Sequence, residues 1–405
     1  MSTTIAALFA TLITTGMTSA VSHDITIVGG SIVTVIFAAS TIVRRDASVY
    51  PVFLIGTISM VVIALVSSEA NTSPFSSTIH VLSMYVALIG LAFSSRDLSS
   101  FCQQLMMGTN LLLTGWVLYQ GYDAEPLKAW QISNPTGGAN VMAAQINMTL
   151  PLILVRIRAS TGQKRLAYIA LICLNGIAVV VVMSRNGIGA MLIILTLYFL
   201  FNHKRMAVVV VGVIFGVASS LDGILQIPLV YNVLVRLRFV GYKPVAPRSL
   251  IWRVAWDHVK THPMLGVGPG GPKKALAVID TYHAHNNFVQ VALETGIPSA
   301  TIFSLLILLL LALPARTLLQ TRDRFVVTLP ILAYASYSWT AMPFTYPGMT
   351  LLLAACVHEA RIAIRAKVRL PGNPVVHRRY FQQDVRQKRH DRIAQESTLF
   401  HGCGD

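Results

Sequence analysis

The chain contains repeated runs of about twenty apolar residues, and these runs constrain its fold more than any other feature. A run of this length crosses the hydrocarbon core of a bilayer as one α-helix, which pairs its backbone polar groups within the segment. The sequence therefore predicts an all-α polytopic membrane protein with about twelve transmembrane helices. The expected spans are residues 3–20, 25–43, 49–67, 77–94, 101–119, 138–155, 166–183, 187–201, 206–221, 297–315, 325–342 and 345–361.

The composition excludes an ordinary soluble globular protein. Hydrophobic residues make up 54% of the chain and charged residues 12%, and the mean hydropathy is +0.63. No positively charged segment precedes the first apolar run, so we expect no cleaved signal peptide.

Lysine and arginine are distributed unevenly between the two ends of the predicted spans. The short loops on one side contain Arg44, Arg45, Arg96, Arg156, Arg158, Lys164, Arg165, Lys204, Arg205, Arg316, Arg322 and Arg324. The short loops of the other side contain only Lys128 and Arg185. Because positive loops remain in the cytoplasm, we expect both termini to be cytoplasmic.

The formal net charge of +16 follows largely from this topology. The basic residues are spread over loops and the C-terminal tail without a recognisable nucleic-acid motif, so we expect membrane lipids and no nucleic acid as partners. Cys102, Cys173 and Cys356 lie in or beside spans and Cys403 in the tail, so no disulfide framework is predicted for the external loops.

One long polar insertion divides the chain. We expect transmembrane helices 1–9 in residues 1–221, a large external loop in 222–296, helices 10–12 in 297–361 and a basic cytoplasmic tail in 362–405. Loops of this length are uncommon unless they have a function, which makes the insertion the first place to look for a site.

Part of the insertion has the pattern of a short amphipathic helix. Apolar residues have helical spacing from Ser249 to Lys260, and Ser249 is the predicted N-cap. Trp252 and Trp256 fall on one side, so we expect this helix at the membrane interface with its tryptophans at headgroup depth. His262-Pro263 should end it, and a turn-rich glycine segment follows at residues 266–271.

Several arginines are candidates for binding phosphate groups. Arg185 and Arg248 are the principal candidates, because a guanidinium can donate two parallel hydrogen bonds to phosphate oxygens. Arg236, Arg238 and Arg253 are further candidates. Each could instead be an interfacial or solvated side chain without a function, and the sequence leaves both interpretations open.

The stretch from His283 to Asn287 offers two imidazoles and two amides beside these cations. A neutral histidine can take a proton from a hydroxyl nucleophile, so His283 and His285 are candidate general bases, with a purely structural role as the alternative. Asn286 could orient a base or a substrate group. The acidic and histidine residues nearby lack a metal-binding spacing, and we expect neither a metal nor another cofactor.

These residues resemble a known family. The loop from Arg248 through Trp252, the segment His262-Pro263-Met264-Leu265-Gly266-Val267-Gly268, and His285-Asn286 followed at a distance by Gly296 are similar to the O-antigen ligase and polymerase superfamily. Asn134-Pro135 and Ser184-Arg185-Asn186-Gly187 match its landmarks in position and type. The pattern departs at Ser299, where the ligases usually have glycine.

The resemblance implies a GT-C-like membrane glycosyltransferase in the bacterial inner membrane with a periplasmic site. Its donor would be O-antigen linked to undecaprenyl diphosphate, and its acceptor the lipid A core oligosaccharide. His285 would be the base, chosen over His283 because asparagine follows it and Gly296 has the required distance. Arg185 and Arg248 would bind the diphosphate, with no metal in the reaction.

Three other functions remain open on the sequence alone. An O-antigen polymerase acts on the same lipid carrier, and a protein O-oligosaccharyltransferase is a further member of the superfamily. A lipid or solute transporter is an alternative of another class, for which ionisable residues would be expected in the middle of the spans.

Overall fold

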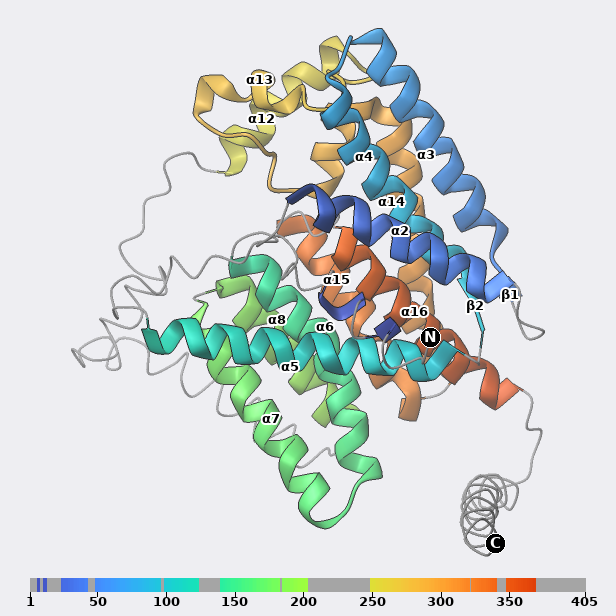
Figure 1. The fold of residues 1–405 in the computed structure, drawn as a ribbon, viewed down its shortest axis with the longest axis vertical. Coiled ribbons are helices and arrows are strands. Elements are labelled where there is room, and N and C mark those ends of the chain that lie inside the picture. Colours follow the sequence, from blue (N-terminus) through green and yellow to red (C-terminus); the bar gives the residue numbers. More distant parts are fainter. Residues whose placement is uncertain are drawn as a thin grey trace, which may run out of the picture. The chain divides into compact units, whose positions relative to one another are not determined.

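The computed structural model describes residues 6–7, 10–12, 23–42, 48–95, 98–123, 139–182, 184–202, 248–320, 322–340 and 347–368 (Figure 1). The chain forms two compact units, Met1–Ile362 and Ala363–Asp405. Of the second unit, the described part is the end of one helix that continues to Val368. The expected landmarks Asn134-Pro135 and the candidates Arg236 and Arg238 lie outside the described residues.

The described part of the chain is almost entirely helical. Its helices are α2 (His23–Ile42), α3 (Pro51–Ala70), α4 (Phe75–Ala87), α5 (Ser99–Asp123), α6 (Ala139–Ala159), α7 (Gly162–Val181), α8 (Arg185–Asn202), α12 (Arg248–Thr261), α13 (Pro272–Ala275), α14 (Asn287–Gln320), α15 (Leu329–Thr340) and α16 (Pro347–Val368). Short 3₁₀ helices occur at Leu88–Ala92, Ala277–Ile279 and Arg322–Thr328. Strands β1 (Ser48–Val49) and β2 (Phe93–Ser94) pair antiparallel.

Six of the described helical segments are long and apolar enough to cross a membrane. They are Pro51–Ala70, Phe75–Ala92, Asn140–Ala159, Gly162–Val181, Arg185–Asn202 and Asn287–Leu318. A seventh apolar segment, Phe325–Trp339, is shorter. The prediction of a helical, multi-pass membrane protein is confirmed at this level, whereas the expected span at 206–221 and most of that at 3–20 lie outside the described residues.

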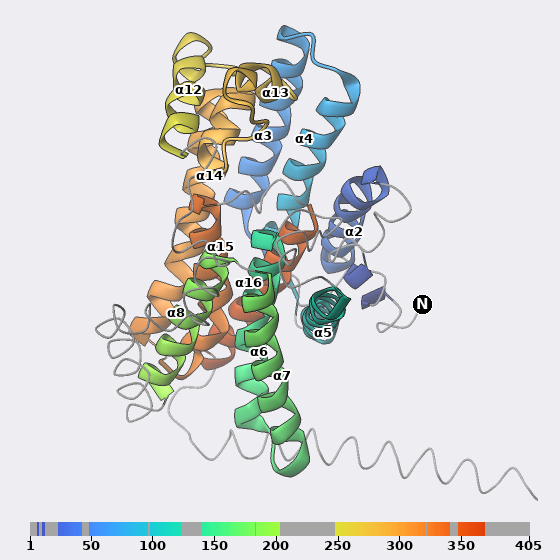
Figure 2. The same ribbon diagram turned by 90° about the vertical axis from the view of Figure 1, so that its left-hand side faces the viewer.

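Helices form at the expected spans 25–43, 101–119 and 345–361, but none of these three is among the six. α16 carries Glu359 and Arg361 among its apolar residues, and α5 carries several amides. α5 runs across α6 and α7 and not parallel to them. Figure 1 shows α5 from the side, and Figure 2 shows it along its axis while α6 and α7 are seen lengthwise.

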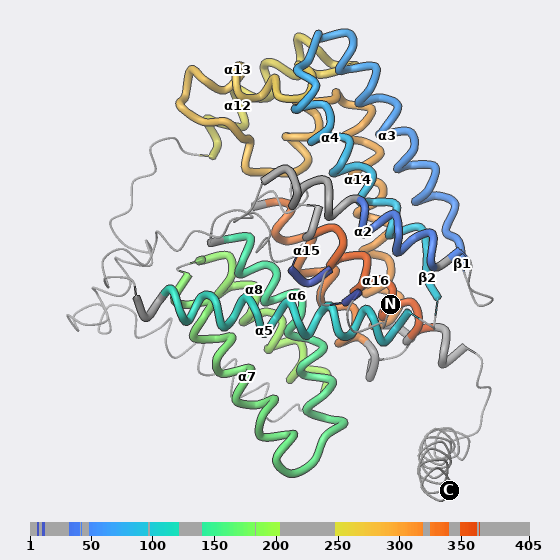
Figure 3. The backbone as a smooth tube through the Cα atoms, viewed as in Figure 1, coloured from blue at the N-terminus to red at the C-terminus, as the bar shows by residue number. Residues whose placement is uncertain are grey.

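Two helices connect most of the others. α14 packs against α3, α12 and α15, and α6 packs against α5, α7, α8 and α15, as the backbone path in Figure 3 shows. Amides inside this bundle bond between helices: Asn110 donates to Thr149 (2.8 Å), and Asn175 accepts from Thr114 (2.6 Å). Such bonds satisfy polar groups that would otherwise be costly in an apolar interior.

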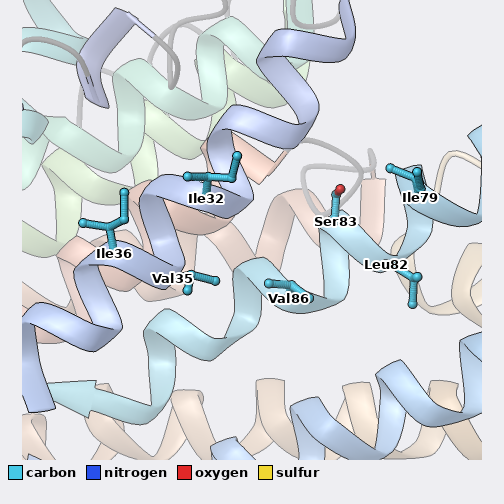
Figure 4. A pocket seen from close by; sticks show the side chains of 7 residues that line it. All are labelled: Ile32, Val35, Ile36, Ile79, Leu82, Ser83 and Val86. Carbon is cyan, nitrogen blue, oxygen red and sulfur yellow. The ribbon is translucent and has the colours of Figure 1, made fainter.

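An open apolar groove lies between α2 and α4 (Figure 4). Its lining is Ile32, Val35, Ile36, Ile79, Leu82, Ser83 and Val86. All but Ser83 are aliphatic, as expected of a surface that faces lipid tails, which are as apolar as leucine side chains.

Candidate active site

The candidate site is built around a break in α14. Gly296 interrupts the helix with φ 85° and ψ 174°, a backbone conformation that residues with a Cβ rarely adopt. A Cβ at this position would also lie 2.2 Å from the Met264 carbonyl oxygen. The break divides α14 into a short first segment and the apolar segment that the sequence predicts from residue 297.

The loop that follows α12 fills this break. Backbone hydrogen bonds run from Val267 N to Leu293 O (2.8 Å), from Gly268 N to Glu294 O (3.1 Å) and from Ile297 N to Pro263 O (2.8 Å). These bonds pair groups that the interrupted helix leaves without an intrahelical partner. These bonds explain why the sequence pattern contains both the His262–Gly268 segment and Gly296: the first pairs with the backbone that the break at the second leaves open.

The same loop packs on the turn between α3 and α4. Ser67 Oγ donates to the Leu265 carbonyl (2.5 Å), and Asn71 Nδ2 donates to that of Gly266 (3.5 Å). A Cβ at Gly268 would lie 2.6 Å from the Asn71 Cβ, and one at Gly270 would lie 2.5 Å from Ser77 Oγ. The glycines of this segment therefore allow the loop to pack closely against α3, α4 and the turn between them.

Replacing Gly296 with alanine should destabilise the protein strongly. This backbone conformation, which is essentially restricted to glycine, costs an L-residue about 1–3 kcal/mol, and overlap with the Met264 carbonyl adds about 1–3 kcal/mol. Thermal unfolding of the purified protein in detergent measures the effect. The matched control is Gly115→Ala in α5, where a Cβ meets no atom within 4 Å and the midpoint should not fall. Equal midpoints for Gly296→Ala and the unaltered protein would contradict the assignment.

α12 forms as an amphipathic helix, with two differences from its prediction. Its described part runs from Arg248, so Ser249 lies inside the helix and not at its N-cap. Its buried face is Ile251, Ala255 and Val259, which pack on α14 and not on lipid. His262-Pro263 follows its end at Thr261, as predicted.

The two predicted interfacial tryptophans have different environments. Trp256 is exposed, whereas Trp252 is half-buried and its Nε1 donates a hydrogen bond to the Ala284 carbonyl (2.9 Å). The Ala284 amide in turn donates to Gln290 Oε1 (2.9 Å), and Gln290 Nε2 donates to Glu294 Oε1 (2.8 Å). Both backbone groups of the buried Ala284 are therefore fixed, which holds the histidines on either side of it.

His285 has a backbone conformation that few side chains adopt. Its φ is 51°, in the left-handed region, where non-glycine residues are uncommon. Strained conformations of this kind cluster at functional sites, because the surrounding structure must stabilise them. The imidazoles of His283 and His285 are both solvent-accessible.

The surroundings of His285 keep its imidazole neutral. Partial desolvation by neighbouring protein atoms is the largest effect and lowers the pKa of His285 below its ordinary value of 6.5, and the charges of His283 and Arg248 lower it further. Partial desolvation also lowers the pKa of His283. A neutral imidazole at neutral pH can accept a proton, which a general base requires.

Asn286 has a structural role. Its Oδ1 accepts hydrogen bonds from the amides of Phe288 (2.9 Å) and Val289 (3.2 Å), which makes it the N-cap of α14. Its Nδ2 donates to the Trp339 carbonyl (3.3 Å) at the end of α15. The structure thus uses both ends of this amide to anchor the loop beside His285.

Arg185 and Arg248 are both exposed; Arg185 is the first residue of α8, and Arg248 is the first described residue of α12. Arg248 lies close enough to His285 for its charge to act on the imidazole. Arg253 is exposed on α12. The partial positive charge of a helix N-terminus adds to a guanidinium in attracting a phosphate.

A chain of contacts connects Arg185 with the loop of residues 283–286, called the histidine loop below. Asn147 donates to the carbonyl of Gly187, two residues after Arg185 (2.8 Å), and to the hydroxyl of Tyr337 on α15 (3.0 Å). Tyr337 lies two residues before Trp339, whose carbonyl accepts from Asn286. The start of α8 and the start of α14 are therefore both attached to the same end of α15.

The sequence did not single out three residues that shape this region. Gln290 and Tyr337 carried no recognisable signal, and Trp339 packs on Trp252 with ring centroids 6.3 Å apart. Asn140 and Asn147 have polar partners on neighbouring segments, in Ser184, Gly187 and Tyr337.

Ser299, where this sequence departs from the family pattern, is packed inside the protein. Ser299 is fully buried, and its Oγ makes no hydrogen bond to any residue that the structure describes. Its small side chain is thus accommodated one turn after the break at Gly296.

Comparison with curated proteins gives no match. Residues 168–304 match the family model described as O-antigen ligase. The matched region begins in α7, ends in α14 and includes Arg185, Arg248, His285 and Gly296. The resemblance predicted from the motifs is thereby confirmed: this part of the chain is similar to the O-antigen ligase family, and it lies in a multi-pass membrane protein.

Proposed function

We propose that the protein is an O-antigen ligase, which transfers O-antigen polysaccharide from undecaprenyl diphosphate to the lipid A core on the periplasmic face of the bacterial inner membrane. The observation that carries this proposal is the placement of His285 in a loop fixed on both sides of Ala284, with the charge of Arg248 acting on it. The family match supports the class of reaction.

The proposed reaction is a single displacement. His285 takes the proton of the acceptor hydroxyl while the acceptor oxygen forms a bond to the anomeric carbon of the donor. The bond from that carbon to the diphosphate oxygen breaks on the opposite face, and undecaprenyl diphosphate leaves with the bonding electrons, which inverts the anomeric centre. Arg185 and Arg248 stabilise the charge that develops on the leaving group, as a divalent ion could do elsewhere.

Deletion of the gene in its native host tests the function. A ligase deletion should leave lipid A core without attached O-antigen and should accumulate lipid-linked polymer, both visible by gel analysis of lipopolysaccharide. Attachment of single repeat units would instead identify a polymerase. Unchanged lipopolysaccharide would contradict both functions.

The pH dependence of transfer tests the base. His285 acts as a base only when neutral, so activity should be present above its lowered pKa and lost as the pH falls through it. His283→Ala removes a positive neighbour, so the pKa of His285 should rise and the acidic limb of the kcat/KM profile should move to higher pH. An acidic limb at the same pH in both proteins would show that another group titrates.

A further inference from the structure

A cluster of ligand-type side chains joins two helices, α5 and α16. Both helices lie away from α12 (Figure 1). The cluster joins Cys102 of α5 to His358 and Glu359 of α16, and one ligand atom from each residue lies within 4.8 Å of the others. Cys102 and His358 are 0% exposed and Glu359 is 9% exposed. Ionisable groups buried this deeply in a membrane protein are rare and generally have a function.

The two oxygens of the Glu359 carboxylate have different surroundings. Its Oε2 accepts a hydrogen bond from Gln103 Nε2 (2.9 Å), and Arg156 donates to the Oε1 of the same glutamine. The Oε1 of Glu359 is buried and makes no hydrogen bond to any described residue. A buried carboxylate oxygen without a partner is costly, whereas a carboxylate held by a hydrogen bond on one oxygen is a common arrangement for a metal ligand.

We propose that Cys102, His358 and Glu359 bind a structural zinc ion. A thiolate, an imidazole and a carboxylate are the three ligand types that Zn²⁺ accepts in proteins, and a tetrahedral ion needs one more ligand. One thiolate and one carboxylate balance the charge of the ion, so the ion together with these three ligands is neutral. Neutrality matters in this interior, because an unbalanced charge would be strongly disfavoured.

The zinc site would fasten α16 to α5. These two helices already meet through the Gln103–Glu359 hydrogen bond and through Cys356 Sγ, which lies 3.4 Å from Met106 Sδ. A zinc ion would add bonds between them that the unfolded chain lacks, so its binding contributes directly to folding stability. This inference departs from the expectation of no metal, but it is independent of the proposed transfer reaction, in which the ion has no part.

Metal content of the purified full-length protein in detergent tests the site. After exposure to zinc and removal of loosely bound metal, the protein should retain about one zinc ion per chain. Cys102→Ser and Glu359→Gln should each lose most of this zinc and should unfold at a lower temperature. The matched control is Cys173→Ser, at the exposed cysteine of α7, which should retain both the zinc and the stability. Absence of zinc from the unaltered protein, or equal zinc in Cys102→Ser and Cys173→Ser, would overturn the proposal.

Cobalt provides a test that does not depend on the folding of a variant. Co²⁺ exchanged into the unaltered protein should show the near-ultraviolet charge-transfer absorption of a thiolate ligand, and Cys173→Ser should show it equally. Bound cobalt without that absorption would exclude Cys102 as a ligand and overturn the site.

Discussion

Replacing His285 with alanine is expected to lower the turnover of glycan transfer by about 10²–10⁴-fold, the usual contribution of a general base. The acceptor hydroxyl would then have to lose its proton to water while its oxygen attacks the donor. Binding of the lipid-linked donor should persist, because in the proposed mechanism its diphosphate is bound by arginines. Turnover and donor affinity would be measured with purified donor and acceptor in a reconstituted assay.

A second substitution separates the effect of losing the imidazole from the effect of changing the backbone conformation. Asparagine tolerates a positive φ better than most residues, so His285→Asn should keep the loop in place while removing the base. It should lose as much turnover as His285→Ala. His283→Ala should keep most of its turnover at about pH 8, where a neutral imidazole is fully populated. Full turnover by either His285 variant would refute the assignment.

Replacing Arg185 with lysine is expected to lower kcat by about tenfold or more, although the positive charge is kept. A guanidinium can bind two phosphate oxygens at once in a fixed plane, whereas an ammonium acts as a point charge. Arg248→Lys should have a similar effect. Because these bonds strengthen as the leaving group gains charge, kcat should fall more than the affinity for donor.

The control for the arginine variants is Lys260→Ala. Lys260 lies on the exposed face of α12 and pairs with Asp257 (3.1 Å), a surface ion pair that contributes little to stability. This variant should transfer glycan at the rate of the unaltered protein. If Arg185→Lys does so as well, Arg185 is an interfacial residue without a role in the reaction.

The sequence was most informative where structure depends on local pattern. The apolar runs predicted the helices because chain length and hydrophobicity decide whether a segment crosses a bilayer. The glycine segment, the end of α12 at His262-Pro263 and the start of a long apolar helix after Gly296 follow from local backbone preferences. The resemblance of the histidine loop could also be read directly from the sequence.

The sequence was least informative where contacts join distant segments. Trp252 was predicted to lie among lipid headgroups, but its hydrogen bond to Ala284 places it against the histidine loop. The link from Asn147 to Tyr337 spans 190 residues, and the cluster of Cys102 with His358 and Glu359 joins the first third of the chain to the last. Periodicity shows which face of a helix is apolar, but not which helix packs on it.

The break in α14 has a consequence for the order of folding. The loop that fills the break is a near neighbour of α14 in the sequence, so its backbone bonds close a short segment with little loss of chain entropy. The bond from Ser67 to Leu265 joins residues 198 positions apart. During synthesis, the α12–α14 unit can therefore assemble by itself once α14 has emerged, and then dock onto the older α3–α4 hairpin. Refolding studies should find hydrogen-exchange protection at Val267 and Ile297 before protection of the α3–α4 turn.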